Sequence, residues 1–92
     1  MSYTCRSLTL PDHLKESIDA YVETGRPTGG FLRAVINNDL VMAVGLADEE
    51  NLPLLPVFVW YLYNECPRGC FGFSTAWSEW IARKRAEREA KQ

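Results

Sequence analysis

Hydrophobic residues are most concentrated between Asn51 and Glu65, in the stretch NLPLLPVFVWYLYNE. Ten of its positions are Leu, Val, Phe, Trp or Tyr, and no charge interrupts it before Glu65. Its β propensity makes a buried strand a real alternative. The length of the run, the helical spacing of its apolar residues and Asn51 as a possible N-cap favour a helix that Pro67 ends. We therefore predict a central apolar helix over 51–65.

Four other stretches repeat apolar residues at helical spacing, which predicts further helices over 12–23, 31–36 and 40–47 and a last one starting at Ser74 or Thr75. Gly25 is expected to end the first, and Asp39 to cap the third. Gly45 costs about 1 kcal/mol relative to alanine inside a helix, so another backbone is expected to pack closely against it.

The remaining segments are an extended arm, predicted over 1–9, and a polar helical tail, predicted over 83–92. The fold class predicted is all-α. We expect a small single-domain bundle of four to five helices spanning 1–92, with a central apolar helix and a charged C-terminal helical tail.

Composition and charge narrow the class of protein. The 92 residues are 47% hydrophobic and 24% charged, which is typical of a globular domain rather than a disordered chain. The formal charge of −2 provides no net attraction to nucleic acid. The N-terminus MSYTCRSLTL lacks the pattern of a signal peptide, and the longest apolar run is too short to span a bilayer. An odd number of cysteines fits a reducing compartment, so a cytoplasmic protein is predicted, without membrane association.

Three segments, PTGGFLRAVINNDL (27–40), AVGLAD (43–48) and LPVFVWYLYNECPRGCFG (55–72), resemble a family of small uncharacterised phage and prophage proteins. The likeness covers roughly residues 10–81 and leaves out the tail. It implies a helical accessory protein encoded by a phage and acting in the bacterial cytoplasm. It implies no catalytic residue.

Few residues suggest catalytic or metal chemistry. Cys66 and Cys70 have a C-x-x-x-C spacing, but only Cys5 and His13 could complete a four-ligand zinc site. Small core cysteines are the expected reading, with a redox-sensitive disulfide as the alternative. His13 could pair with a cysteine as a nucleophile, yet a surface histidine is the simpler interpretation. We predict no enzyme activity, no metal and no cofactor.

A candidate anion site precedes the second predicted helix. Free backbone N–H groups at a helix start can hold a phosphate or carboxylate, and two arginines lie nearby. The candidate residues are Arg26, Thr28, Gly29, Gly30 and Arg33. Ordinary turn chemistry is the alternative, since the P-loop pattern with its lysine is absent.

Aromatic residues crowd the last third of the chain, more than one small core can easily enclose. Exposed aromatic side chains usually mark an interface. The predicted interface residues are Trp60, Tyr61, Tyr63, Phe71, Phe73, Trp77 and Trp80. Complete burial inside the chain is the alternative.

Three functions follow from these patterns. The first is a non-enzymatic protein that associates with itself, as a homodimer or higher oligomer, and inhibits a host regulator or defence factor. The second is a protein that sequesters a small anionic ligand such as a nucleotide. The third is DNA binding through the basic residues Arg83, Lys84, Arg85, Arg88 and Lys91, which interspersed glutamates make less favourable.

Overall fold

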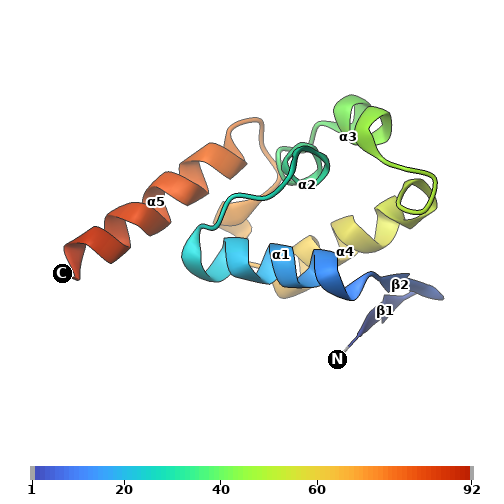
Figure 1. Ribbon diagram of the computed structural model, residues 1–92, viewed down its shortest axis with the longest axis horizontal. Helices are drawn as coiled ribbons and strands as arrows, with labels where there is room; N and C mark the ends of the chain where they lie inside the picture. Colours follow the sequence, from blue (N-terminus) through green and yellow to red (C-terminus); the bar gives the residue numbers. More distant parts are fainter. Residues whose placement is uncertain (1, 92) are drawn as a thin grey trace.

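The chain forms a β-hairpin followed by five α-helices in the computed structural model, which describes residues 2–91 (Figure 1). Strands β1 (Tyr3–Cys5) and β2 (Leu8–Leu10) pair antiparallel. The helices are α1 (Asp12–Thr24), α2 (Gly30–Ile36), α3 (Leu40–Leu46), α4 (Leu55–Glu65) and α5 (Ala76–Ala90), with 3₁₀ turns at Leu52–Leu54 and Arg68–Cys70. The prediction of a largely helical protein is confirmed.

The prediction of a purely helical fold with an extended N-terminal arm is wrong, because this segment forms the hairpin. Cys5 lies opposite Leu8, so Arg6 and Ser7 form a two-residue turn. Both have positive φ, 51° and 68°, as the twist of a tight hairpin requires. Neither residue is the Asn-Gly or Asp-Gly pair that announces such a turn in a sequence, so the hairpin carried no clear signal. Met1 and Gln92, the outer ends of the predicted arm and tail, lie outside the described residues.

Helix α4 is central, as predicted, but it starts four residues later than expected. Residues 52–54 form a 3₁₀ turn, and Pro56 lies in the first turn of the α-helix, where a missing N–H donor costs little. The Asn51 side chain caps nothing. Its backbone N–H instead donates to Asp48 Oδ1 at 2.7 Å.

The buried face of α4 joins the other elements into one apolar cluster. Its members on α4 are Val57, Phe58, Tyr61 and Leu62. The hairpin packs on this helix, with Leu10 fully buried and the rings of Tyr3 and Tyr61 in edge contact at 4.8 Å. The hairpin thus covers apolar surface of α4 that a free arm would leave open.

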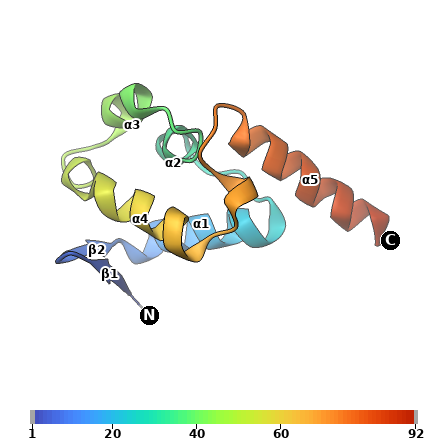
Figure 2. The same ribbon diagram turned by 180° about the vertical axis from the view of Figure 1, so that it is seen from behind.

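Helices α1 and α5 cross closely near Gly25, which ends α1 with a φ of 76°. A Cβ atom at this position would lie 2.7 Å from Lys84 Cβ. Glycine is therefore required both by the left-handed conformation and by the approach of α5. Beyond this crossing α5 extends away from the rest of the molecule to its C-terminal end, while the hairpin and α3 lie toward the opposite end of the long axis (Figures 1 and 2).

Candidate functional site

Helix α3 has an apolar sequence on every side, LVMAVGL, yet most of its surface is exposed. Its only buried residue is Ala43, with 2% of its surface accessible. Val41 is 82% exposed, and the other large side chains of α3 are 45–68% exposed: Leu40, Met42, Val44 and Leu46. A helix that is hydrophobic all round normally belongs in a protein interior. In this chain, α3 is the element whose environment contradicts its composition.

The local geometry explains why α3 forms without being buried. Asp39 lies at its N-cap, as predicted, and Asp39 Oδ1 accepts a hydrogen bond from the Met42 N–H at 3.2 Å. Ala43 anchors the helix against the body, and a shallow hollow borders it on each side. Ala34, Leu40, Ala43 and Val59 help to line one of about 60 Å³, and Arg33, Met42 and Leu46 help to line one of about 390 Å³. Capping and a single small anchor thus hold α3 at the surface.

Exposed apolar residues continue from α3 onto α4. Leu40 and Val59 line the same hollow, and Val59 is 54% exposed. Further along α4 the rings of Trp60 and Tyr63 touch, with centroids 6.3 Å apart, and both are exposed. We call the combined area the apolar surface; its members are Leu40, Val41, Met42, Val44, Leu46, Val59, Trp60 and Tyr63.

The total accessible area of the chain also indicates an open structure. It is 6032 Å². A folded monomer of this mass has roughly 5,400 Å² on average. The chain therefore exposes about a tenth more surface than a protein of its size usually does, and the apolar surface is part of that surplus.

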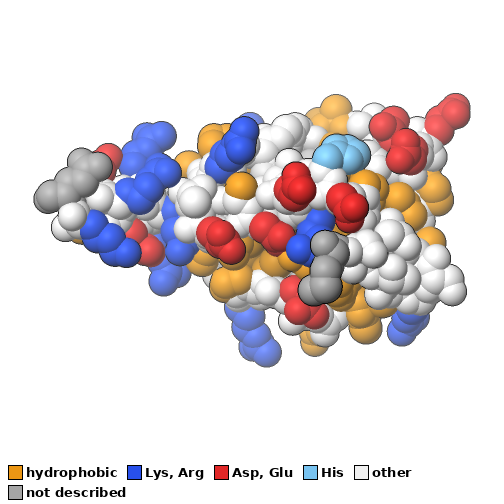
Figure 3. All heavy atoms as spheres, turned by 60° about the horizontal axis from the view of Figure 1, so that its bottom comes forward, with side chains coloured by type: hydrophobic (Ala, Val, Ile, Leu, Met, Phe, Trp, Pro, Cys, Tyr) orange, Lys and Arg blue, Asp and Glu red, His pale blue; other side chains and the backbone are white. Residues whose placement is uncertain are grey.

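The charges at the two ends of α3 are acidic, and Arg33 borders the hollow on one of its sides. Asp39 lies at its N-terminal end, and the exposed residues Asp48, Glu49 and Glu50 follow its C-terminal end. No Lys or Arg occurs between Arg33 and Arg68. Half of the ten basic residues lie on α5 or at its C-cap, and several basic side chains are seen near its C-terminal end (Figure 3). The apolar surface on α3 therefore has an acidic border.

The seven aromatic residues predicted as an interface fall into three groups. Trp60, Tyr63 and Phe73 are exposed, and Phe71 and Trp77 are half-buried. Tyr61 and Trp80, with 7% and 5% exposure, are packed inside this chain, so neither presents its ring to a partner. The surplus of exposed hydrophobic surface is real, but much of it lies on α3 rather than in the aromatic last third.

Tyr61 is buried because it faces the hairpin and α1. Its ring contacts Tyr3, and its hydroxyl donates a hydrogen bond to Asp19 Oδ1. Asp19 is also paired with Lys15 Nζ at 2.9 Å. Burial, followed by the hydrogen bond to Asp19, raises the pKa of Tyr61 above its ordinary value. Tyr61 therefore links α4 to α1 within the fold.

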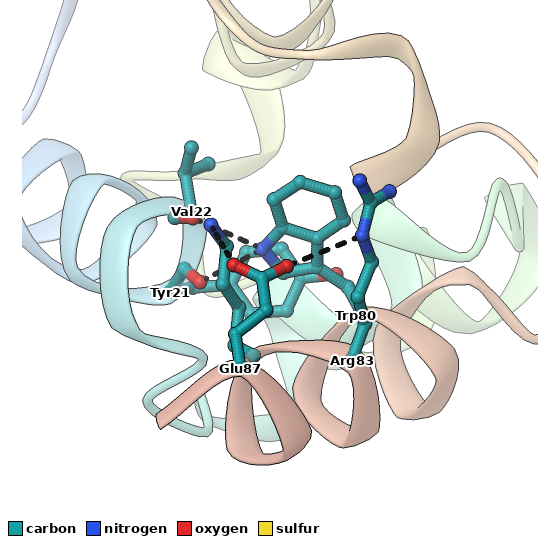
Figure 4. A network of polar contacts seen from close by, with 6 residues as sticks. Tyr21, Val22, Trp80, Arg83 and Glu87 are labelled. Carbon is teal, nitrogen blue, oxygen red and sulfur yellow. Dashed lines mark hydrogen bonds and ion pairs between the residues drawn. The ribbon is translucent and has the colours of Figure 1, made fainter. Parts of the chain in front are cut away.

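Trp80 joins α5 to the C-terminal end of α1 (Figure 4). Its indole N–H donates to the backbone oxygens of Tyr21 and Val22, each at 3.1 Å. These carbonyls belong to the last turn of α1, where intrahelical donors run out. Arg83 and Lys84 lie over the ring at 5.2 and 5.0 Å. Trp80 is thus a structural residue with cations on its outer side.

Two basic residues of the predicted tail form ion pairs within α5. Arg83 Nε lies 3.4 Å from Glu87 Oε2, and Lys84 Nζ lies 3.6 Å from Glu87 Oε1. Both cations also contact Trp80. Two of the five basic residues proposed for DNA binding therefore have partners in this chain.

The residues of the predicted anion site separate into two places. Arg26, Thr28 and Gly29 line a polar hollow of about 320 Å³ together with His13 and Glu16. Gly30 and Arg33 line the other hollow beside α3, and the Arg33 guanidinium lies 4.6 Å from the centre of a Trp77 ring.

The Thr28 hydroxyl is occupied as well. It accepts from Trp77 Nε1 at 3.0 Å and donates to the Gly29 carbonyl at 3.1 Å. Gly29 is the N-cap residue of α2, which is only seven residues long. The two arginines thus do not converge on one ligand position, and Thr28 serves to hold the loop against α5.

The cysteines lie in or beside the core. Cys70 is fully buried, and Cys5 and Cys66 are partly buried and unpaired by disulfides. The neighbouring Cys70 thiol, followed by burial, raises the pKa of the Cys66 thiol. Among residues 2–91, no three His, Cys, Asp or Glu side chains are grouped as metal ligands. All three thiols are therefore at least partly enclosed by this chain.

The exposure of α3 was not predicted from its sequence, although the signal was present. Residues 40–46 contain no polar side chain, and an amphipathic helix would have carried some on its outer face. Within residues 2–91, no helix is both long and apolar enough to cross a bilayer. Comparison of the chain with protein-family models, curated proteins and solved structures found no match.

Proposed function

We propose that this protein acts without catalysis, by protein–protein interaction through the apolar surface on α3 and α4. The observation that carries the proposal is the exposure of α3, a helix with an apolar residue or glycine at every position. Large exposed apolar areas on soluble proteins mark interaction sites. The side chains of α3 offer contact area but no nucleophile, acid or base.

The resemblance to small phage and prophage proteins suggests the biological setting. In that setting the protein is an accessory factor in the bacterial cytoplasm that binds and inhibits a host regulator or defence factor. The identification of a host target rests on analogy with phage accessory proteins. The interaction surface itself rests on the exposure of α3.

The test replaces exposed apolar residues of α3 with neutral polar residues of high helix propensity. Val41→Gln together with Val44→Gln removes the outer part of the α3 face, and glutamine is a good helix former. Phe73→Gln is the matched control, because Phe73 is exposed to a similar degree as Val44 but lies outside the apolar surface. Immobilised wild-type protein is compared with both variants for proteins retained from a bacterial lysate, and the mass of each is measured in solution.

We expect a retained partner or a self-associated form that the Val41/Val44 variant loses and the Phe73 variant keeps. A wild-type protein that is monomeric and retains nothing would contradict the proposal. The same holds if the Phe73 variant loses the partner and the Val41/Val44 variant keeps it.

Anion binding is a second candidate, supported by the polar hollow that contains His13, Arg26 and Thr28. Thermal shift against inorganic phosphate and a nucleotide panel tests it. Since Arg33 lies at a different hollow, Arg26→Ala should remove a ligand-induced shift, whereas Arg33→Ala should leave it. A shift that survives both substitutions, or no shift with any anion, would exclude this candidate.

A further inference from the structure

The charged residues at the two ends of α3 indicate the chemistry of a partner that would cover this helix. Taking the proposed function as its basis, we propose that the apolar surface receives a helix of another protein, with an apolar face about two turns long and Lys or Arg at both ends. Three features lead to this occupant: the shape of the outer side of α3, the charges at its two ends, and the mismatch that a second copy would create.

The outer side of α3 has the relief that a packed helix needs. Val41 and Gly45 are one turn apart and share this side. Val41 protrudes, while no atom of residues 2–91 outside the helix's own turn lies within 4 Å of where a Gly45 Cβ would be. The close packing expected at Gly45 is therefore not provided by this chain. A neighbouring helix could bring a side chain into this notch, as ridges enter grooves in helix pairs.

The length of α3 limits the contact. Seven residues rise about 10 Å, or roughly two turns. The hollows beside α3, one bordered by Leu40 and Val59 and the other by Met42 and Leu46, widen the area on both sides. An apolar face of similar length on a partner helix would cover this area, and its next residues would reach the ends of α3.

Both ends of α3 carry acids. Asp39 stands at one end and Asp48, Glu49 and Glu50 at the other. Two cations lie beside the apolar surface but not at the ends of α3. Arg33 borders the hollow of Met42 and Leu46 and lies over Trp77, and Arg6 lies over Trp60 on α4. A partner helix with basic ends would match this border, whereas acidic ends would be repelled.

A second copy of this chain would not provide that match. In a two-fold dimer the same patch meets itself, so the acids bordering one α3 would face the acids bordering the other. Half of the ten basic residues lie on α5 or at its C-cap, and α5 extends toward the other end of the long axis (Figures 1 and 3). Like charges at an interface disfavour the pairing.

The experiment uses two designed helical peptides of about 16 residues, a length at which an alanine-rich helix is at least marginally stable. Both carry the same leucine stripe. One has Lys and the other Glu at the flanking and terminal positions. Binding of each labelled peptide to the full-length protein is followed by fluorescence anisotropy at low and at high salt.

We expect the Lys peptide to bind about ten-fold more tightly at low salt, as two or three exposed ion pairs would produce. High salt should reduce this preference, because exposed charges are screened. Val41→Gln with Val44→Gln should weaken both peptides. Glu49→Lys with Glu50→Lys should reverse the preference without affecting the fold, since both side chains are exposed. Asp48 is left in place because its side chain holds the following turn.

The other outcomes separate the two proposals. Equal binding of both peptides would overturn the charge assignment and leave the proposed function standing. A wild-type dimer that Val41→Gln with Val44→Gln converts to monomer, with neither peptide bound, would identify a second copy as the occupant and overturn this inference alone. A monomeric wild-type protein that binds neither peptide would overturn this inference. If that protein also retains no partner from a lysate, the proposed function is overturned as well. Adsorption to phosphatidylcholine vesicles that depends on Val41 and Val44 would point to a lipid surface and overturn both.

Discussion

Replacing Trp80 by phenylalanine distinguishes a core role from an interface role for this aromatic residue. The indole N–H donates to the carbonyl oxygens of Tyr21 and Val22 at the end of α1. The Tyr21 oxygen keeps a second donor, the Gly25 N–H at 2.9 Å, so the Val22 oxygen is the acceptor that loses its side-chain partner. The smaller ring also leaves a cavity where α5 meets α1.

The magnitude follows from these two losses. An acceptor left unsatisfied in a partly buried position costs about 1–3 kcal/mol, and a cavity of methyl size or more adds about 1 kcal/mol. We expect Trp80→Phe to lower the free energy of unfolding by about 2–3 kcal/mol. A domain of this length has roughly 5–14 kcal/mol in total. With about 4–8 °C per kcal/mol, Tm should fall by roughly 10–20 °C.

Thermal and urea unfolding followed by circular dichroism measure this change. Trp60→Phe is the matched control, because Trp60 is 40% exposed and its indole N–H donates no hydrogen bond to a residue within 2–91. Its cost should stay below about 1 kcal/mol. If the two substitutions destabilise equally, or if Trp80→Phe changes self-association while leaving Tm unaltered, the structural role of Trp80 is refuted.

Three further predictions concern α3 and Tyr21. Gly45→Ala should raise the free energy of unfolding by about 1 kcal/mol in urea titrations, because a methyl group there meets open space, yet it should weaken peptide binding by filling the notch; a loss of stability would show that the space is not free. Asp39→Ala should remove the cap on the Met42 N–H, costing about 1 kcal/mol, and should speed amide exchange in α3 more than in α4; equal acceleration in both helices would contradict a local role. Burial raises the pKa of Tyr21, so its stabilising contribution is complete below pH 10 and is lost as pH rises above 10, by up to about 1.4 kcal/mol per pH unit. Tyr21→Phe should therefore make the decline of stability between pH 10 and 12 shallower than in the wild-type protein; identical slopes for the two proteins would refute this assignment.

The positions of the helices were largely readable from the chain alone. Apolar spacing, Gly25 and Asp39 are local signals, and local hydrogen bonding and backbone conformation respond to them directly. The bounds of helix α1 and the N-cap of α3 accordingly agree with the prediction. The hairpin was missed because its turn, Arg6-Ser7, adopts positive φ without the residues that usually favour it.

Which apolar residues are covered was decided only by tertiary structure. Trp60 and Trp80 look alike in sequence, each following apolar neighbours in a helix. Trp80 is buried because α5 crosses the end of α1, and Trp60 is exposed because it points away from the core. The same holds for α2 and α3, two seven-residue helices rich in apolar residues, of which α2 contributes four buried residues and α3 a single alanine.

The physical reason is that the hydrophobic effect has no direction. Sequence periodicity determines which residues share a face, but removal of that face from water depends on which distant element lies against it. The composition alone determined that this chain has more apolar side chains than one small core can enclose. Only the packing of α1, α4, α5 and the hairpin around one core left α3 as the place where that surplus meets solvent.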